Sequence, residues 1–253
     1  MATQGSSQGA QSTTPDSGSN AVVSGGVRVS SAFIYWRMSD LLPVVDAIPH
    51  DRNRVPPRQA VTKKWPVLHY GDVPRIDLAT WRFEVSGLVE HPFSLSYDGL
   101  LALPHQDTVC DIHCVTRWSR LDNRFEGIPV QDVLRRAQPK PEATYVLVHA
   151  EQGYTTNLPL AELDLPENLL AFRHDGADLT PEHGWPLRLL VPHLYFWKSA
   201  KWVRGFELLD FDMPGFWEQN GYHMHGDPWR EERYGGMYVD QVAINRYRNS
   251  SKK

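Results

Sequence analysis

Short apolar segments, many of them ended by proline or glycine, follow one another along most of this chain. Trp81, Phe83 and Val85 alternate with charged residues and predict a half-buried strand that ends at Gly87. We expect further strands at residues 108–114, 145–148, 187–191 and 202–209. These segments lack the regular strand–helix–strand alternation of a doubly wound sheet. The pattern therefore predicts an α+β fold of mixed sheets.

The helices expected between these strands are short. Residues 97–103 form a brief apolar run that is stopped by Pro104, which predicts one or two helical turns. Residues 130–137 place apolar side chains at i, i+3, i+4 and i+7, the spacing of an amphipathic helix. The chain has no GxGxxG or Walker motif, so we do not expect a glycine-rich nucleotide cradle.

Changes in composition divide the 253 residues, enough to bury one large core, into four parts. Residues 1–26 are rich in Gln, Ser, Gly and Thr and are expected to be disordered; a transit peptide is the alternative, but arginine is lacking. Residues 27–64 contain RNRVPPRQAVTKK and are expected to form an extended arm over the domain. The domain itself is expected at residues 65–245, followed by a frayed basic tail at 246–253.

Charge and hydropathy limit the partners of the chain. The net charge is −4, so no overall basic field attracts nucleic acid or a membrane surface, and basic clusters must be local sites. No apolar run approaches the roughly 18 residues of a membrane span, and we recognise no export signal. We therefore expect a cytoplasmic protein, and a monomer. Eleven histidines and nine tryptophans supply polar-tipped rings that are suited to lining a pocket.

The two cysteines, Cys110 and Cys114, are expected to be free thiols. On a strand their Cα atoms would lie about 13 Å apart, whereas a disulfide needs less than about 7 Å. Free thiols suit a reducing compartment. An inert, buried cysteine is the ordinary interpretation of Cys114. However, Arg117 and Arg120 follow it, and cations beside a thiol depress its pKa and make the thiolate a ligand for a soft metal.

Two other patterns allow a metal, and both have ordinary alternatives. Cys110, His113 and Cys114 with a remote histidine could hold zinc, but structural zinc sites usually show two spaced ligand pairs and no second cysteine pair exists here. His223 and His225 would share one face of a strand, yet the flanking residues favour a polar surface turn.

Two later segments carry cations where an anion would fit. Arg188 stands inside the otherwise apolar HGWPLRLLVP, and a buried arginine needs an anionic partner, which is either a carboxylate or a bound ligand. In KSAKWVRG three cations surround Ser199, as in a phosphate site, although a solvated basic loop has the same composition. These cations are Lys198, Lys201 and Arg204.

Seven sequence blocks occur in an order that is typical of one family: WPVLHYGDVP, WRFEVSGLVEHP, HCVTRWS, FEGIPV, GYTTNLPL, HGWPLRLLVP and KSAKWVRGFELL. By these blocks the chain resembles the sulfite oxidase-like molybdopterin-binding oxidoreductases over residues 65–215. The resemblance implies the mixed-sheet domain of that family and a Mo-molybdopterin cofactor. The length is nearest to the single-domain methionine sulfoxide reductase catalytic subunit, whose twin-arginine signal is absent here.

The resemblance also implies roles for particular residues. Cys114 matches the cysteine whose thiolate binds molybdenum. His69 matches the upstream cofactor-binding asparagine, His183 the residue before the buried arginine, and Arg188 the arginine that binds the pterin and its phosphate. The segment that closes over the cofactor matches Ser199, Ala200 and Lys201. Tyr154 matches the active-site tyrosine of the sulfite oxidases.

The function implied is two-electron oxo transfer on a small sulfite-, sulfoxide- or N-oxide-like substrate, with electrons exchanged with a separate partner. Tyr154 would donate a hydrogen bond to the transferring oxygen, and Arg117 would steer an anion. Sulfite oxidases carry an arginine where this chain has Leu68, which argues against sulfite. A non-catalytic pterin carrier and a zinc-stabilised interaction domain are the alternatives.

Overall fold

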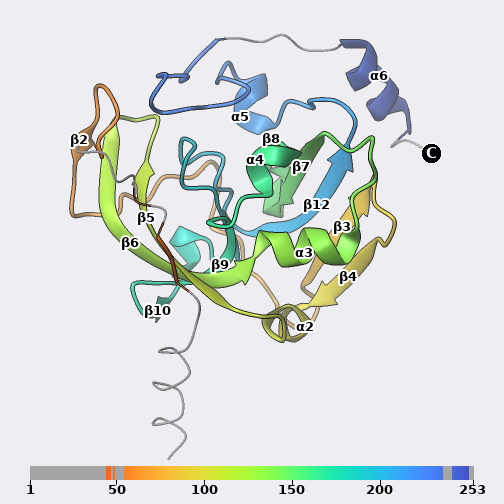
Figure 1. Ribbon diagram of the computed structural model, residues 1–253, viewed down its shortest axis with the longest axis horizontal. Coiled ribbons are helices and arrows are strands. Elements are labelled where there is room, and N and C mark those ends of the chain that lie inside the picture. The colour runs from red at the N-terminus through yellow and green to blue at the C-terminus, as the bar shows by residue number, and fades with distance from the viewer. Residues whose placement is uncertain (1–43, 47, 49–53, 236–240, 251–253) are drawn as a thin grey trace, which may run out of the picture. The chain divides into compact units, whose positions relative to one another are not determined.

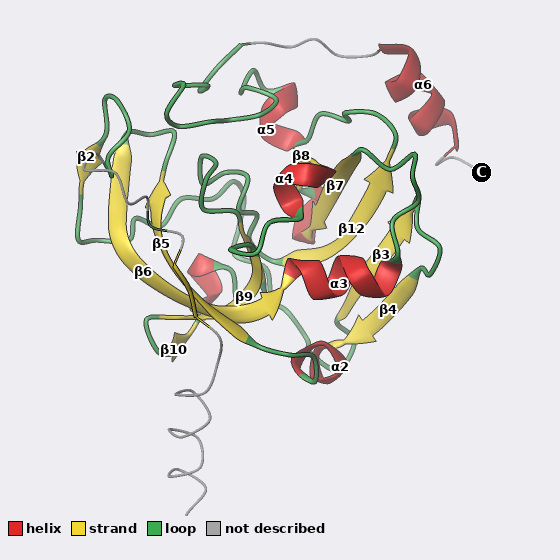
Figure 2. Cartoon of the chain, in the orientation of Figure 1, coloured by secondary structure: helices red, strands yellow, loops and turns green. Residues whose placement is uncertain are grey.

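Two β-sheets carry most of the regular structure in the part of the chain that can be described (Figures 1 and 2). The computed structural model describes residues 44–46, 48, 54–235 and 241–250, all within one compact unit, Leu41–Lys253. The segment 1–26, expected to be disordered, lies outside the described residues. None of the helices in the described ranges is long and apolar enough to cross a membrane.

The first sheet has seven strands and is built around a long antiparallel pair. Its central order is β1-β5-β6-β9-β10, with β2 paired to β6 and β11 paired to β9. The strands β1 and β2 run parallel to their neighbours, and the other pairs are antiparallel. The bounds are β1 Val44–Asp46, β2 Ala60–Val61, β5 Gln106–His113, β6 Trp118–Pro129, β9 Leu169–His174, β10 Ala177–Asp178 and β11 Arg188–Leu190.

The second sheet has five strands in the order β4-β3-β12-β7-β8. The pair β12–β3 is parallel and the other pairs are antiparallel. A Cβ atom at Gly205 of β12 would lie 2.3 Å from the Glu84 carbonyl oxygen of β3, so this close pairing requires glycine. The bounds are β3 Arg82–Gly87, β4 Phe93–Ser96, β7 Tyr145–Ala150, β8 Thr155–Pro159 and β12 Val203–Leu209.

The helices are short, as the sequence predicts (Figure 2). Ser96 caps the N-terminus of the first of them through its hydroxyl, which accepts from the Gly99 N–H. Single 3₁₀ turns occur at Glu151–Gly153 and Pro181–His183. The helix bounds are α2 Tyr97–Leu101, α3 Val130–Ala137, α4 Leu160–Leu163, α5 Phe216–Gln219 and α6 Gln241–Ser250.

The helix α6 corrects the expectation of a frayed end from residue 246. Ile244 is buried and packs with Leu147, Leu209 and Met213 beside the second sheet. The Tyr247 hydroxyl donates to the Glu207 carboxylate over 2.7 Å. These contacts repay the entropy of ordering residues whose own sequence is polar.

The segment 27–64, expected to form an extended arm, contributes two short strands to the first sheet, β1 and β2, in the part that the structure describes. Its residues 60–61 form β2, and the Ala60 N–H donates to the Arg117 carbonyl oxygen over 3.0 Å. The main core lies among the second sheet, α3 and the inner faces of β9 and β11. Cys110 and Cys114 belong to two separate smaller clusters.

Candidate active site

A cavity of about 390 Å³ is lined by the cysteine turn, the turn after β11 and the loop before β3. Its size suits a cofactor or a small substrate. The lining segments are loops and turns that follow or precede strands of both sheets, so both sheets position the cavity. Aromatic side chains dominate its wall, namely Trp65, Tyr70, Trp118, Tyr154, Phe196, Trp197, Trp202, Phe216, Trp217 and Tyr222.

Cys114 lies on the cavity wall at the end of β5, where a tight turn leads into β6. The Arg117 N–H donates to the Cys114 carbonyl oxygen, and the Cys114 N–H donates to that of Trp118. The Thr116 hydroxyl donates to the Cys114 Sγ over 3.1 Å.

Burial raises the pKa of the Cys114 thiol, which corrects the expectation of a depressed value. The Arg117 side chain is exposed, and the Arg120 guanidinium is paired with Asp175 at 2.6 Å. Neither cation therefore lowers the pKa of this thiol; Arg233 does, but burial outweighs it, and a bound metal ion would favour the thiolate further.

Arg188, at the start of β11, is only 1% exposed and lines the cavity. Its Nη1 donates to the His183 carbonyl oxygen over 2.9 Å, and its Nη2 donates to that of Ser199 over 3.0 Å. Its Nε is buried without a hydrogen-bond partner. Among the described residues no carboxylate lies within ion-pair distance of this guanidinium. The carboxylate alternative from the sequence is therefore not observed.

Aromatic rings compensate only part of the charge of Arg188. Its guanidinium carbon lies 4.3 Å from the centroid of Phe196 and 5.2 Å from that of Trp65. Burial still lowers the pKa of Arg188 to about 9. An anion bound beside this guanidinium would stabilise its charged form, so the position suits an anionic ligand.

Lys201 brings a second cation to the same wall. Its Nζ donates to the carbonyl oxygens of Leu68, over 2.8 Å, and Glu182, over 2.5 Å. Burial and the nearby Arg188 lower the pKa of Lys201 to about 7. Next to it, Ala200 lines the cavity, and the Ser199 hydroxyl accepts from the Val191 N–H over 2.9 Å.

Lys198 and Arg204, which the sequence groups with Lys201, are not on the cavity wall. Lys198 is fully buried with Glu218, their N–O distance is 2.7 Å, and its Nζ also donates to Asn157. Arg204 pairs with Glu151 at 2.6 Å. Of the three cations expected from KSAKWVRG to bind a phosphate, Lys201 is therefore the one that lines the cavity.

Two of the other four predicted site residues line the cavity and two do not. Tyr154 and His69 line the cavity, whereas His183 and Arg117 do not. The Tyr154 hydroxyl donates to the Trp197 carbonyl oxygen over 3.1 Å, and burial raises the pKa of this phenol well above 10. The His69 Nδ1 lies 2.9 Å from a backbone oxygen two residues on.

His183 acts behind the cavity wall. Its ring stacks on Trp65 with centroids 4.0 Å apart, and its carbonyl oxygen accepts from Arg188. The residue therefore positions Arg188 and one wall ring.

Two features of the cavity have no counterpart in the sequence interpretation. Trp118 lines the cavity, and its indole Nε1–H is buried without a partner. Phe216 and Trp217 of α5 form part of the opposite wall. The signals were the tryptophan inside HCVTRWS and the density of aromatic residues in FWEQNGY.

The zinc alternative has no ligand set in the part of the chain that the structure describes. No group of three or more His, Cys, Asp or Glu side chains there is arranged to hold a metal ion. Cys110 packs with Ile112 and Phe125, and the His113 Nδ1 lies 2.8 Å from the Ser119 hydroxyl. Both cysteines are free thiols, as the sequence predicts.

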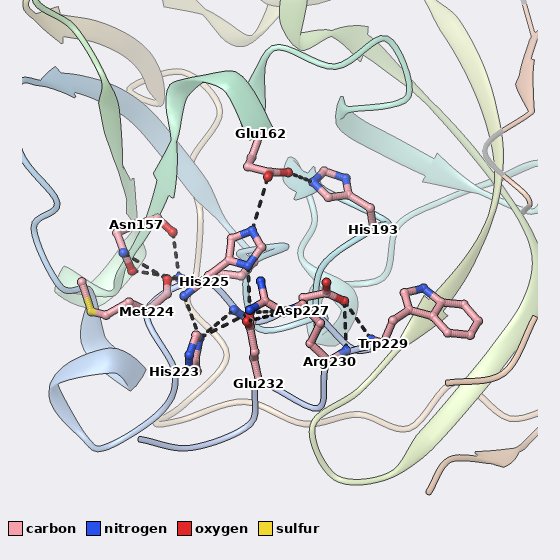
Figure 3. A network of polar contacts seen from close by, with 12 residues as sticks. Asn157, Glu162, His193, His223, Met224, His225, Asp227, Trp229, Arg230 and Glu232 are labelled. Atoms are coloured by element: carbon pink, nitrogen blue, oxygen red, sulfur yellow. Dashed lines mark hydrogen bonds and ion pairs between the residues drawn. The ribbon is translucent and has the colours of Figure 1, made fainter. Parts of the chain in front are cut away.

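The HxH pair belongs to a ladder of histidines and carboxylates (Figure 3). His225 lies 2.8 Å from Glu232 through Nδ1 and 3.3 Å from Glu162 through Nε2. His193 lies 2.7 Å from the same Glu162. The ladder ties the segment after α5 to α4, which is a structural role for a polar turn.

Comparison with known proteins identifies the family. Residues 70–217 match the oxidoreductase molybdopterin binding domain. The chain belongs to this family. The molybdopterin family and the α+β fold expected from the sequence are thereby confirmed.

Relatives and a solved structure agree with this membership. The uncharacterized oxidoreductase YuiH of Bacillus subtilis (strain 168) is 54% identical over 72% of this chain and 92% of its own length. The putative protein-methionine-sulfoxide reductase subunit YedZ1 of Azospira oryzae is 30% identical over 70% and 69%. The sulfane dehydrogenase SoxCD of Paracoccus pantotrophus shares the fold, with a TM-score of 0.54 at 22% identity, over 60% of this chain and 43% of that one.

The residues of the molybdopterin domain fit the Mo-molybdopterin cofactor of the family. The cofactor combines a thiophilic metal with an anionic phosphate, and the cavity presents a thiol, Cys114, and the buried cation Arg188. The Arg188 Nε and the Trp118 Nε1 are two buried donors without partners beside that space. Unsatisfied donors of this kind are expected where a polar ligand belongs.

Replacing Arg188 by alanine should destabilise the cofactor-loaded protein more than the cofactor-free protein, because the partner of this cation is the ligand. Thermal melting of both forms measures the difference. Arg173→Ala is the matched control: Arg173 pairs with Glu126 at 3.2 Å, so its two melting shifts should be equal. Equal shifts for Arg188→Ala would make it a purely structural residue.

Lys198→Met should destabilise the fold by about 3–5 kcal/mol, because it leaves the buried Glu218 carboxylate without its cation. Urea unfolding measures this change. The double variant Lys198→Met/Glu218→Gln should recover most of the loss. Arg204→Met, which breaks a part-exposed pair, should cost about 1 kcal/mol or less. A similar loss in both single variants would contradict the assignment.

Proposed function

We propose that this chain is a molybdopterin-dependent enzyme of two-electron oxygen-atom transfer, acting on a small neutral or singly charged substrate such as a sulfoxide or an N-oxide. The observation that carries the proposal is one cavity that holds a free thiol, a buried cation without a carboxylate and a wall of aromatic rings. Mo-molybdopterin, when bound, supplies the oxygen-atom transfer itself.

The residues of the cavity divide the work of holding the cofactor. Cys114 provides the thiolate ligand, and its raised pKa means that metal binding must release the thiol proton. Arg188 and Lys201 bind the anionic pterin and its phosphate. The bound anion raises their lowered pKa values and so favours the charged form of each side chain. Ala200 leaves room for close approach, and His69 and His183 lie at the loops that flank this group.

The lining residues favour a substrate that is not a dianion. Arg188 and Lys201 are the lysine and arginine side chains that line this cavity in the described ranges, and both are engaged with the cofactor in this proposal. The other walls are largely aromatic. Such walls suit methyl, alkyl or aryl groups on sulfur or nitrogen.

Tyr154 is the proton-bearing group on the substrate side. Its raised pKa keeps the phenol protonated, so it can donate a hydrogen bond to the oxygen that is transferred. To do so it exchanges its present bond to the Trp197 carbonyl oxygen. In the reducing direction a sulfoxide, two electrons and two protons give a sulfide and water.

The similarity to a protein named as a putative methionine-sulfoxide reductase subunit supports the reducing direction. A pterin carrier without turnover remains the alternative, and the experiment that separates the two is direct. Protein purified from a host that makes molybdopterin is assayed with a reduced viologen dye against sulfoxides, N-oxides, nitrate and sulfite. Loaded protein that is silent with every substrate would favour the carrier.

Cys114→Ser should retain the fold and lose both activity and bound molybdenum, because a hydroxyl is a harder and less acidic ligand than a thiol. The wild type should hold about one molybdenum per chain. Cys110→Ser is the control, since Cys110 is equally buried but lies in another cluster; it should keep metal and activity at a cost of about 1–3 kcal/mol for the buried hydroxyl. The opposite result would identify Cys110 as the ligand.

Sulfite should be a poor substrate of the wild type, and Leu68→Arg should improve it. Leu68 lines the cavity and is 49% exposed, so an arginine there can reach a bound anion from solvent. One charge-assisted contact is worth roughly 1.5–3 kcal/mol, or about ten- to hundredfold in kcat/KM for sulfite. Leu68→Met is the control and should change little. Efficient oxidation of micromolar sulfite by the wild type would contradict the proposed specificity.

A further inference from the structure

Unpaired cations gather at the edge of the first sheet, next to the turn that carries Cys114. The Thr62 N–H donates to the Ser119 carbonyl oxygen, so β2 and the residues after it run beside the start of β6. Lys63, Lys64 and Arg117 are exposed there. None of the three has an ion-pair partner among the described residues.

Two exposed apolar side chains come from β2 and from the segment that packs on His113, and Arg230 of that segment is paired with Glu232 at 3.2 Å. The Val61 side chain is 57% exposed and Trp229 is 38% exposed, and Trp229 lies 6.0 Å from the ring of His113, next to Cys114. We call the surface formed by Val61, Lys63, Lys64, Arg117, Trp229 and Arg230 the Arg117 face. Apolar groups with a charged surround are typical of transient protein interfaces.

The Arg117 face includes part of the turn that carries the candidate metal ligand, since the Arg117 N–H donates to the Cys114 carbonyl oxygen over 3.0 Å. The Gln59 Nε2 donates to the Cys114 carbonyl oxygen over 3.1 Å, and the Arg233 Nη1 donates to that of Val115 over 2.6 Å. Side chains from the segments before β2 and after α5 therefore fix the turn that carries Cys114 beside this surface. Electron transfer between proteins weakens steeply with distance, which favours exchange at this face.

The charge of the face is opposite to that of the whole chain. The chain carries a net charge of −4, so its overall field does not attract an acidic partner, and attraction must come from a local group of cations. Arg58 pairs with Glu231 beside the face and Arg230 pairs with Glu232, so Lys63, Lys64 and Arg117 are its cations without an ion pair among the described residues. The charge of Arg117 still acts on Glu231 and helps to lower the pKa of that carboxyl. Such a pattern increases the association rate of an acidic protein and orients it.

We propose that the Arg117 face docks a small acidic one-electron carrier protein, of the flavin or iron–sulfur class. The proposal rests on the proposed redox function. Two reduced carriers, one sulfoxide and two protons give two oxidised carriers, one sulfide and water, with each carrier losing one electron. Arg117 thereby has a role outside the cavity, in recognition of the carrier and not of the substrate.

The test compares a protein donor with a dye donor, using the loaded enzyme. Reduced acidic flavodoxin and ferredoxin serve as protein probes, and reduced methyl viologen serves as the dye. With the protein probes the wild-type rate at low carrier concentration should fall as ionic strength rises, because salt screens the attraction. Lys63→Glu/Lys64→Glu should raise the KM for the carrier about tenfold or more, with dye-linked turnover unchanged.

Arg246→Glu/Arg248→Glu is the matched control, since it reverses two exposed cations on α6, a helix packed beside the second sheet. It should leave the carrier KM within about twofold. Arg117→Glu should raise the carrier KM as the lysine variant does, with the KM for a sulfoxide unchanged.

Each contrary result has a distinct meaning. Absence of dye-linked turnover would overturn the proposed function. Dye-linked turnover without turnover by either protein probe, or equal carrier KM values in the lysine variant and its control, would overturn the docking proposal alone. Binding to phosphatidylglycerol vesicles that the lysine variant loses and its control retains would show that the face meets an anionic membrane, and would also overturn it.

Discussion

The arrangement of the cavity depends on the buried guanidinium of Arg188. Its two terminal nitrogens bind carbonyl oxygens from the loops at His183 and Ser199, so one side chain fixes the segments before and after β11. No described carboxylate offsets its charge, and burial lowers its pKa to about 9. A buried cation without a carboxylate partner suits an anionic ligand, and Arg188 and Cys114 line one cavity that offers the space for it.

The cations of the chain serve three different purposes, which burial and pairing distinguish. Arg188 and Lys201 line the cavity, and burial lowers the pKa of each, which disfavours their charged forms while no anion is bound. Lys198 is fully buried, but Glu218 forms an ion pair with it. This pair fixes the indole of Trp197, whose Nε1 donates to the same carboxylate over 2.8 Å. Arg117 is exposed beside other cations and is available to a partner in solution. Charge alone therefore does not identify a site; the presence or absence of a fixed partner does.

Sequence patterns predicted the parts of this structure that depend on local periodicity. The strand at Trp81–Gly87, the helix at 130–137 and the buried strand around Arg188 appear as expected, because alternation and amphipathic spacing record which faces are buried. The patterns did not predict pairing between distant segments. Lys198 and Lys201 are three residues apart in one basic loop, yet one meets Glu218 and the other meets carbonyl groups of Leu68 and Glu182. The patterns also do not show that Cys114 is buried, and burial is what raises the pKa of its thiol. They do not show either that Arg120 of β6 pairs with Asp175, which lies in the turn after β9.

The pairing of Lys198 with Glu218, which the sequence does not show, also positions the aromatic wall of the cavity. Trp197 is held at both ends, by Glu218 at its indole and by the Tyr154 hydroxyl at its carbonyl oxygen. Glu218 belongs to α5, whose Phe216 and Trp217 complete the wall. The buried ion pair of Lys198 and Glu218 therefore holds Trp197 in place and, through its carbonyl oxygen, the phenol of Tyr154. In the function proposed above, this cavity selects a substrate by the shape of its apolar groups and by a hydrogen bond from Tyr154, while Arg188 and Lys201 hold the cofactor.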